Sequence, residues 1–420
     1  MVIEGYNELD MLSESQVEFA SNKFRRLLYY LPNTTGVGHE SRAIAVLTGL
    51  RSYLKKTEFL IVSSTKVPQE FLRHNLELVR LPTLSNISTD NRQEMTPRYL
   101  NNSNLADVLI LRQSLLNTVF TSYRPDLLMI DHHPIGLEGE ILPWLLHKRI
   151  APNEFVTTYI SRGIIAKPAF IRPPYQRSQR GVDQISVGDL YDRFYVLESF
   201  DRLSPEIRNT YTKSNFANRV RFLDRVTVKT KAELISSSDV SKIYQLPTDR
   251  LITANLGHNT LTSSLIEAVV KGFTLLNTDQ SMTLLIVLSP NVDSHTISHI
   301  QSRLASDRVI IRGFIPDLVD ILNVSAVAIC RAGYNTVAEL DLTGCPALII
   351  PEDYGSQEQV LRIGSLSKSA YSVLMPELIT PKRIAEALKK MLQEPRRNPY
   401  LINKYRVSQL LLADLLTLEL

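Results

Sequence analysis

Two residues in the N-terminal half of the chain have the types and positions needed for proton transfer. His39 follows a pair of glycines, Gly36 and Gly38, and Asp131 ends an apolar run that reads as a strand. An imidazole can accept a proton near neutral pH, and a carboxylate that holds the ring makes it a better base. We predict that neighbouring strand ends bring His39 and Asp131 together. A packing role for the histidine and a helix-capping role for the aspartate are the alternatives.

The residues around this pair raise the question of a metal. His132 and His133 follow Asp131 directly, but adjacent positions supply few ligands to one ion, and nothing nearby has the spacing of zinc ligands. We therefore predict no metal. Four further residues are assigned to the glycine turn and the acceptor side of the site: Gly36, Gly38, Arg42 and His132.

The C-terminal half indicates a different kind of site. An apolar run ends at Cys330, and Gly333 then precedes a helical pattern. The free N–H groups and the dipole at a helix start suit a diphosphate. Glu339 lies about one and a half turns into that helix, where a carboxylate could bridge ribose hydroxyl groups. A buried turn followed by an ordinary helix is the alternative.

These residues follow strand-like runs in both halves of the chain. The runs of the N-terminal half are 25–32, 59–64, 76–81, 127–131, 155–160 and 194–199. Those of the C-terminal half are 251–256, 283–289, 308–311, 326–330, 347–351 and 371–374. Apolar strands separated by helical patterns indicate parallel sheets covered on both faces. Segment 83–103 is interpreted as a polar loop, because it is rich in Asn, Ser and Thr.

Four segments are expected from this pattern. They are an acidic N-terminal extension over 1–24, a Rossmann-like acceptor domain over 25–228, a Rossmann-like donor domain over 229–398, and a final helix near the domain junction over 399–420. The link between the halves is placed in the polar, serine-rich segment 227–244. Ligands of open α/β sheets bind at the carboxyl ends of the strands. We therefore expect two facing domains with a cleft between them.

Composition excludes several classes of protein. The 420 residues are 44% hydrophobic and 21% charged, which is close to the globular average and argues against disorder. The net charge of +4 is too small to imply nucleic acid. Two cysteines in apolar contexts fit a reducing compartment, and no apolar run is long enough for a membrane span. The N-terminus is acidic and resembles no targeting peptide, so a cytoplasmic location is expected.

The stretch 162–231 is the most basic part of the chain. Arg172, Arg177 and Arg180 surround two prolines and a tyrosine there. A solvated surface loop is one interpretation. A patch for an anionic acceptor or for lipid headgroups, and hence a peripheral contact with a membrane, is the other.

The order of motifs resembles the GT-B glycosyltransferases, and most closely glycosyltransferase family 28. The resemblance runs from about residue 251 to 392 and depends on RGFIPDL, CRAGYNTVAEL and TGCPALIIPEDYGSQEQ. The N-terminal half adds GVGHESRA and RPDLLMIDHHP. The resemblance implies an α/β GT-B fold with a nucleotide-sugar donor held by the C-terminal domain and an acceptor by the N-terminal domain.

The resemblance also implies a role for individual residues. His39 matches a histidine that serves as base or orients the acceptor, and such enzymes need no metal or cofactor. Where the family often has a Gly-Gly-Ser turn, this chain has Asn255-Leu256-Gly257-His258, which leaves the donor's identity open. The residues expected to bind the donor are Gly257, His258, Phe314, Ile315, Arg331, Gly333, Asn335, Thr336, Glu339, Gln357 and Gln359.

The function expected from these motifs is an inverting glycosyl transfer from a nucleotide-diphosphate sugar, expected to be UDP-linked, to an acceptor hydroxyl group. A nucleotide-sugar hydrolase, an epimerase and a non-catalytic protein that binds sugar nucleotides are the alternatives. No nucleic-acid partner is expected, and the acceptor is unknown.

Overall fold

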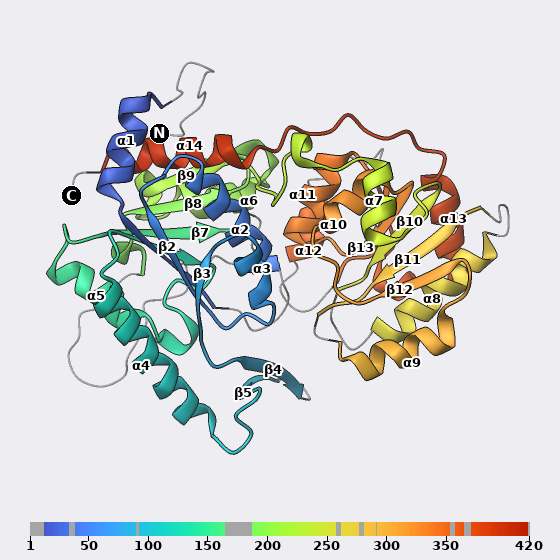
Figure 1. Cartoon of the computed structure of the whole chain (residues 1–420), viewed down its shortest axis with the longest axis horizontal. Helices are drawn as coiled ribbons and strands as arrows, with labels where there is room; N and C mark the ends of the chain where they lie inside the picture. The colour runs from blue at the N-terminus through green and yellow to red at the C-terminus, as the bar shows by residue number, and fades with distance from the viewer. Residues whose placement is uncertain are drawn as a thin grey trace. The chain divides into compact units, whose positions relative to one another are not determined.

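The structure is a computed structural model that describes residues 12–32, 38–89, 92–163, 187–257, 262–276, 281–290, 292–352, 358–364 and 371–418. The chain divides into two compact units: unit 1 comprises residues 1–226 and 404–420, and unit 2 comprises residues 227–403. Each unit has helices packed around a parallel sheet (Figure 1). The expected fold of two parallel α/β domains is confirmed.

Unit 1 is organised around a seven-stranded sheet with the order β3-β2-β1-β6-β7-β8-β9. Every pair of neighbouring strands in it is parallel. The strands are β1 (Arg26–Leu31), β2 (Glu58–Ser63), β3 (Glu77–Arg80), β6 (Leu127–Asp131), β7 (Val156–Ser161), β8 (Arg193–Leu197) and β9 (Val220–Leu223). A separate antiparallel hairpin joins β4 (Leu84–Thr89) to β5 (Arg92–Pro97).

Capping residues lie at the N-termini of helices in unit 1. Ser13 and Gln16 form a reciprocal capping box at α1, and the Asn104 side chain accepts from the Asp107 N–H at α4. The helices are α1 (Glu14–Lys23), α2 (Gly38–Arg51), α3 (Pro68–Arg73), α4 (Leu105–Tyr123), α5 (Leu142–Ile150), α6 (Pro205–Thr212) and α14 (Lys404–Leu416). Short 3-10 helices are η1 (Leu137–Gly139), η3 (Val187–Leu190), η4 (Phe200–Arg202) and η5 (Ala217–Arg219).

Unit 2 has a six-stranded parallel sheet with the order β12-β11-β10-β13-β14-β15. Its strands are β10 (Leu251–Asn255), β11 (Thr283–Val287), β12 (Val309–Arg312), β13 (Val327–Cys330), β14 (Ala347–Ile349) and β15 (Tyr371–Val373). Its helices are α7 (Ser237–Tyr244), α8 (Thr262–Leu275), α9 (Ser294–Leu304), α10 (Leu318–Val324), α11 (Tyr334–Thr343), α12 (Glu358–Ile363) and α13 (Pro381–Met391), with 3-10 helices η6 (Lys231–Glu233) and η7 (Pro376–Leu378).

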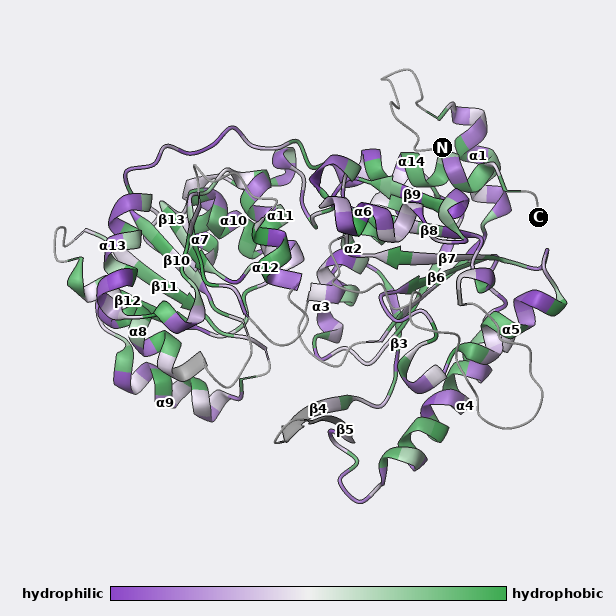
Figure 2. Ribbon diagram, turned by 180° about the vertical axis from the view of Figure 1, so that it is seen from behind, coloured by the Kyte–Doolittle hydropathy of each residue, from purple (hydrophilic) through white to green (hydrophobic). Residues whose placement is uncertain are grey.

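Both faces of the unit 2 sheet are buried, as the continuous apolar runs predict. Ile252 of β10 packs into a cluster with α8 and α13, whereas its neighbour Leu251 packs into a second cluster with α7, α10 and α11. This alternation follows from the opposite directions of successive side chains in a strand. Figure 2 shows the same pattern as hydrophobic strands between helices that carry polar residues on their outer sides.

Three expectations about the elements are corrected. Segment 83–103 is not only a loop, because β4 (Leu84–Thr89) and β5 (Arg92–Pro97) pair within it. The many polar residues of the segment masked the strand propensity of Ile87, Thr89 and Thr96. Strand β9 was not expected. The serine-rich link contains helix α7, whose N-terminus is capped by Ser236 accepting from the Asp239 N–H.

The final helix and the acidic N-terminal segment both belong to unit 1. Helix α14 packs against α2 at Gly49, where an added Cβ would lie 2.3 Å from the Ser408 hydroxyl and 2.8 Å from the Lys404 carbonyl oxygen. The Arg193 and Arg221 side chains and the Tyr195 hydroxyl all donate to the buried Asp414 carboxylate of α14. Helix α1 is tied to the end of the chain, since Lys23 Nζ donates to the Leu418 carbonyl oxygen at 2.6 Å.

Two compositional features have direct counterparts in the structure. Cys330 and Cys345 are both buried and unbonded to another sulfur. Within the described ranges, no helix is long and apolar enough to cross a membrane.

Candidate functional site

The order of strands in each unit marks where a ligand is expected. Read along the chain, the first strand of each sheet lies beside the fourth, with the second and third on its other side. In unit 1 this places the end of β1 beside the end of β6, and in unit 2 the end of β10 beside the end of β13. Such reversals open a crevice at the carboxyl ends of the strands. His39, Arg42 and Asp131 lie at the first position, and Gly257, Arg331 and Gly333 lie at the second. Among the other predicted donor residues, Phe314 and Ile315 follow β12, and Gln359 lies in α12.

The unit 1 position brings His39, Asp131 and Arg42 together. His39 lies in the first turn of α2, and its Nδ1 is 2.9 Å from Asp131 Oδ1. Arg42 of the next turn donates from Nε to Asp131 Oδ2 at 3.0 Å and from Nη2 to Oδ1. The Asp131 carboxylate has no exposed surface. The sequence prediction that β1 and β6 would juxtapose His39 and Asp131 agrees with this geometry.

Tyr29 completes the set of donors to Asp131. Its hydroxyl group donates to Asp131 Oδ2 at 2.9 Å from the middle of β1. Sequence reasoning missed this residue, because Tyr29 stands in an apolar run and reads as core. A tyrosine on β1, the strand directly beside Asp131, was the feature of the sequence that could have indicated this contact.

The charges around Asp131 and His39 determine the protonation states of these two side chains. The Arg42 guanidinium and the hydrogen bonds from His39 and Arg42 hold the pKa of Asp131 well below its usual range despite burial. His39 Nδ1 lies 2.9 Å both from Asp131 Oδ1, which accepts when ionised, and from Arg42 Nη2, which can only donate. With the proton on Nδ1, the ring donates to the Asp131 carboxylate and Nε2 is the basic nitrogen. Burial lowers the pKa of His39, with further lowering from Arg42 and Arg162, against the opposing effect of Asp131. His39 is thus a neutral, oriented base at neutral pH.

Two more histidines lie beside His39. The His132 ring centroid is 5.0 Å from that of His39 and 4.8 Å from that of His133. His132 has a positive φ of 63°, a conformation that few non-glycine residues adopt. Burial, the Arg162 charge and the neighbouring His39 and His133 imidazoles lower the pKa of His132 well below its usual range. In the described part of the chain, no three His, Cys, Asp or Glu side chains gather as metal ligands.

The unit 2 position begins with two glycines. Gly257 follows β10 with a φ of +80°, which a residue with a Cβ adopts only under strain. Gly333 precedes α11 in an extended conformation, so the helix starts without a capping side chain. An added Cβ there would approach the Thr336 hydroxyl only to 3.9 Å. Space is therefore left beside the start of α11.

Arg331 is held by backbone around this position. It donates from Nε to the Leu256 carbonyl oxygen at 3.0 Å, and from Nη1 to those of Ile350 and Pro351 at 3.1 and 3.3 Å. The side chain thus joins the ends of β10, β13 and β14. Its predicted contact with a diphosphate stays a prediction.

Gln359 is also fixed by its surroundings. Its Oε1 accepts from the N–H groups of Ala332 and Glu352 at 3.1 and 3.0 Å, and its Nε2 lies 3.3 Å from Glu352 Oε2. The amide therefore ties the loop after β14 to the start of α11. Its predicted contact with a donor sugar stays a prediction.

Glu339 lies in α11, beyond the glycine turn. Desolvation, with a contribution from the nearby Asp317 charge, raises the pKa of Glu339 to about 8. The carboxyl group is therefore mostly protonated at neutral pH. The other predicted donor residues that can be located, Phe314, Ile315, Asn335 and Thr336, are all partly exposed.

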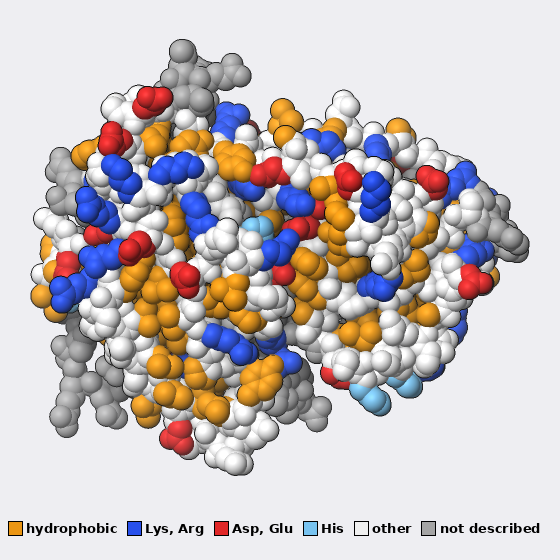
Figure 3. Space-filling view, in the orientation of Figure 1, with side chains coloured by type: hydrophobic (Ala, Val, Ile, Leu, Met, Phe, Trp, Pro, Cys, Tyr) orange, Lys and Arg blue, Asp and Glu red, His pale blue; other side chains and the backbone are white. Residues whose placement is uncertain are grey.

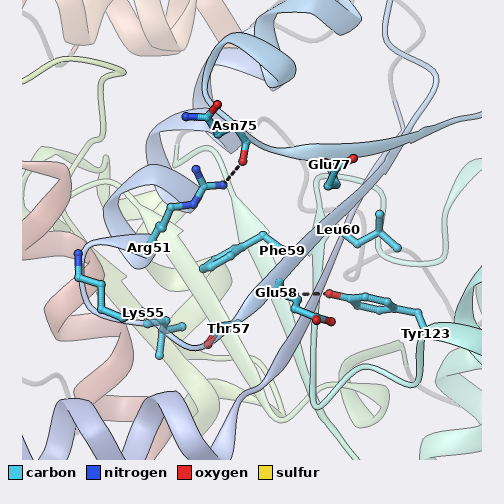
Figure 4. Close-up of a pocket in the computed structure, with 10 residues that line it drawn as sticks. Arg51, Lys55, Thr57, Glu58, Phe59, Leu60, Asn75, Glu77 and Tyr123 are labelled. Carbon is cyan, nitrogen blue, oxygen red and sulfur yellow. Dashed lines mark hydrogen bonds between the residues drawn. The ribbon is translucent and has the colours of Figure 1, made fainter.

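Some predicted residues cannot be placed. Gly36, His258 and Gln357 lie outside the described residues, as do Arg172, Arg177 and Arg180 of the basic stretch. A pocket of about 530 Å³ lies away from the strand-end position of unit 1, at the amino end of β2 (Figure 4). Arg51, Phe59 and Tyr123 line it, and Tyr123 donates to the Glu58 carbonyl oxygen there.

Comparison with known proteins finds a family model that matches the C-terminal part of the chain. Residues 260–409 match the family model described as glycosyltransferase family 28 C-terminal domain. Most of unit 2 lies within the matched range. The range includes Gly333, Glu339 and Gln359, whereas the candidate donor residues Gly257 and His258 lie just before it.

Two curated relatives are similar to part of the chain. The UDP-N-acetylglucosamine–N-acetylmuramyl-(pentapeptide) pyrophosphoryl-undecaprenol N-acetylglucosamine transferase of Exiguobacterium sibiricum is 35% identical over 99 residues, covering 23% of this chain and 27% of the relative. A protein of the same name from Thermodesulfovibrio yellowstonii is 23% identical over 199 residues, covering 46% of this chain and 54% of the relative. The chain thus spans about a quarter to a half of the length of these relatives.

A solved structure resembles nearly the whole chain. The glycotransferase of kitacinnamycin superposes with a TM-score of 0.59 at 15% identity, covering 93% of this chain and 95% of the other. At this identity the likeness shows the fold alone. Together with the two parallel sheets, it assigns the GT-B fold of two Rossmann-like domains.

Proposed function

We propose that the protein is an inverting glycosyltransferase that moves a sugar from a nucleotide-diphosphate donor, with UDP as the expected nucleotide, to an acceptor hydroxyl group. The family 28 domain in unit 2 supports sugar transfer from a nucleotide sugar. The relatives' names specify a UDP-N-acetylglucosamine donor, which supports UDP as the first nucleotide to test. The observation that carries the mechanism is the 2.9 Å contact between His39 Nδ1 and the buried Asp131 carboxylate.

His39 is the proposed base. Nδ1–H donates to Asp131, and Nε2 takes the proton of the acceptor hydroxyl as its oxygen forms a bond to the anomeric carbon of the sugar. The bond from that carbon to the diphosphate breaks on the opposite face, so the configuration inverts. Asp131 keeps its charge and stabilises the imidazolium that forms.

Unit 2 is proposed to bind the donor. The start of α11 at Gly333 would receive the diphosphate, because N–H groups and the positive end of the helix dipole favour an anion. Glu339 would meet the ribose hydroxyl groups, and Gln359 would present its amide to the sugar. The proposal includes no resident metal or cofactor, since helix ends and cationic side chains compensate the leaving diphosphate.

A panel of nucleotide sugars tests the reaction directly. Each donor is incubated with the purified protein, with and without a mixture of candidate acceptors, and the released nucleotide and the glycosylated product are measured. Product formation that needs an acceptor and survives a chelator supports the proposal. Release of nucleotide without acceptor would instead indicate a hydrolase. Binding without turnover would indicate a non-catalytic sugar-nucleotide protein, and loss of activity with chelator would contradict the metal-free site.

A further inference from the structure

A group of cations lies near the proposed base and takes no part in the mechanism above. Lys66 follows β2, Arg80 ends β3, and Arg98 follows the β4–β5 hairpin. The Arg98 and Arg80 guanidinium carbons lie 5.5 and 6.0 Å from the centre of the Tyr99 ring, and Tyr99 is 60% exposed. We call Lys66, Arg80, Arg98 and Tyr99 the Tyr99 cluster. It presents two guanidinium groups beside one accessible aromatic ring, and the Lys66 ammonium group is close enough to Arg98 for their charges to interact.

Short contacts connect this cluster to the helix that carries His39. Glu40, the residue after His39, accepts from the Thr65 hydroxyl at 2.7 Å. The Thr65 carbonyl oxygen in turn accepts from Arg80 Nε at 3.2 Å, and Lys66 is the next residue along the chain. The cluster therefore lies at the same carboxyl edge of the unit 1 sheet as the candidate base.

The charges of Lys66, Arg80 and Arg98 are not neutralised by ion pairs within the described part of the chain. Arg73, a neighbouring cation, pairs with Glu70 at 2.8 Å, but within the described ranges no carboxylate forms an ion pair with Lys66, Arg80 or Arg98. Desolvation and the Arg98 charge lower the pKa of Lys66 to about 8, and Glu40 opposes this only in part. Cations that have no carboxylate partner among the described residues attract an external anion.

The chemistry of the side chains narrows the class of anion. Arginine forks match the oxygens of a phosphate, and lysine adds a compact charge that binds phosphate well. Figure 3 shows lysine and arginine side chains beside exposed hydrophobic ones over the region of β3, the hairpin and α4. Helix α4 exposes Ile110, Leu111 and Leu115 next in sequence to the cluster. The positively charged side chains in this region of unit 1 therefore lie near exposed apolar ones.

We propose that the Tyr99 cluster binds a phosphate group, either on a water-soluble molecule or on a lipid headgroup. That the cluster binds phosphate does not depend on the proposed function. Only the further step, that this phosphate belongs to the acceptor, rests on the proposed function. Binding of phosphate at the cluster can be measured whether or not sugar transfer occurs.

The test compares two triple variants of the full chain. In one, Lys66→Gln, Arg80→Gln and Arg98→Gln neutralise the cluster. In the matched control, Lys55→Gln, Arg149→Gln and Lys213→Gln remove three cations that are exposed elsewhere on unit 1. Calorimetry with inorganic pyrophosphate probes a soluble phosphate, and sedimentation with phosphatidylglycerol vesicles against phosphatidylcholine vesicles probes a headgroup.

The expected result is loss of binding in the cluster variant alone. Its affinity for at least one of the two probes should fall about tenfold or more, because each charge-assisted contact contributes roughly that factor. The control should stay within about twofold of the wild type, and UDP affinity should be equal in the two variants. Binding of pyrophosphate alone would identify a soluble ligand, and binding of anionic vesicles a headgroup.

Two outcomes would overturn the proposal. One is that the wild type binds neither probe, and the other is that the two triple variants lose binding equally, as a general effect of net charge would produce. If the cluster variant fails to fold, as judged from its melting temperature, Arg98→Gln alone replaces it with Arg149→Gln as its control. Absence of transferase activity in the wild type would count against the proposed function but not against this site.

Discussion

The strand-end sites of the two units occupy equivalent positions in their sheets and differ in what surrounds the key carboxyl group. In unit 1, the Asp131 carboxylate is ionised and accepts hydrogen bonds from Tyr29, Arg42 and His39. In unit 2, the Glu339 carboxyl group is desolvated beside Asp317, and its pKa rises to about 8. In unit 1 the protein itself supplies the groups that stabilise the carboxylate charge. In unit 2 a ligand would have to supply them.

This difference fits the division of work in the proposed reaction. A base must be oriented before the acceptor arrives, so its supporting charges belong to the fold. A binding site for an anionic donor gains more if the protein leaves the helix start at Gly333 accessible. The expected effects of mutation therefore differ: turnover and stability should depend on unit 1, and donor affinity on unit 2.

Replacement of His39 should produce the largest effect. His39→Ala should lower turnover on the order of 10²- to 10⁴-fold, the usual contribution of a positioned general base. UDP affinity measured by calorimetry should be unchanged, because the donor is assigned to unit 2. His299→Ala, which removes an exposed histidine of α9, is the control and should keep normal turnover. Near-normal turnover in His39→Ala would assign the residue a packing role.

Replacement of Asp131 should affect stability as well as turnover. Asp131→Asn leaves the buried Arg42 without its counter-charge, and breaking a buried ion pair in this way costs about 3–5 kcal/mol of unfolding free energy. Denaturant unfolding measures this loss. Asp189→Asn removes a carboxylate that is 53% exposed and lies 3.4 Å from Arg219, so it should cost less than about 1 kcal/mol.

The turnover of the double variant tests whether His39 and Asp131 act as a pair. If Asp131 only orients His39, then Asp131→Asn should add little to the loss already caused by His39→Ala. Losses that simply multiply would show two independent contributions.

The pH profile of the reaction should reflect the environment of His39. A base acts only when it is neutral, so activity is present above its pKa and is lost as the pH falls through it. Because burial, Arg42 and Arg162 together lower the pKa of His39, the acidic limb of kcat/KM should have its midpoint below pH 6.5. A midpoint above 6.5 would mean that the Asp131 charge outweighs burial, or that another group limits the rate.

Sequence reasoning located these sites better than it described them. Apolar runs bounded by polar residues predict the strands of both sheets, because a buried parallel strand needs a continuous hydrophobic run. This placed His39 and Asp131 at strand ends. The roles of Tyr29 and Arg42 depend on which strands are neighbours and on how far each side chain reaches, and no local pattern encodes that.

The unit 2 motifs show a second limit. Arg331 stands in a motif expected to meet a diphosphate, and the structure adds a local role that the motif did not indicate: its Nε and Nη1 donate to the carbonyl oxygens of Leu256, Ile350 and Pro351. The β4–β5 hairpin was interpreted as a loop because composition outweighed the β-branched residues within it. The composition of a segment predicts its solvent exposure better than it predicts its backbone conformation.

Replacement of Glu339 should weaken donor binding by an amount that depends on pH. Below pH 8 the carboxyl group is mostly protonated, so Glu339→Ala removes a neutral hydrogen bond, which contributes about 1 kcal/mol or roughly fivefold in affinity. At pH 9 the group is ionised, and the loss should rise to about 1.5–3 kcal/mol, or roughly 10- to 150-fold. Calorimetric titration with UDP at pH 6.5 and 9 measures both values. Equal affinity of wild type and variant at both pH values would remove Glu339 from the ribose role.

The smallest effect should appear in the stability of the ligand-free protein. A carboxyl group whose pKa is raised by folding stabilises the folded state fully below its unfolded pKa, and this contribution is lost as the pH rises through the folded value. For Glu339 that window runs from 4.5 to about 8. Glu339→Gln keeps the shape of the side chain and cannot ionise, so its melting temperature should fall less than that of the wild type between pH 5 and 8.5. Because the group is partly exposed, the difference should be on the order of 1 kcal/mol, or about 2–4 °C for a unit of this size. Glu386→Gln, at an exposed position of α13, should follow the wild type. If the melting temperature of Glu339→Gln also follows that of the wild type, then Glu339 is hydrated in solution. The two carboxyl groups would then differ only in the hydrogen bonds and positive charge that unit 1 provides around Asp131.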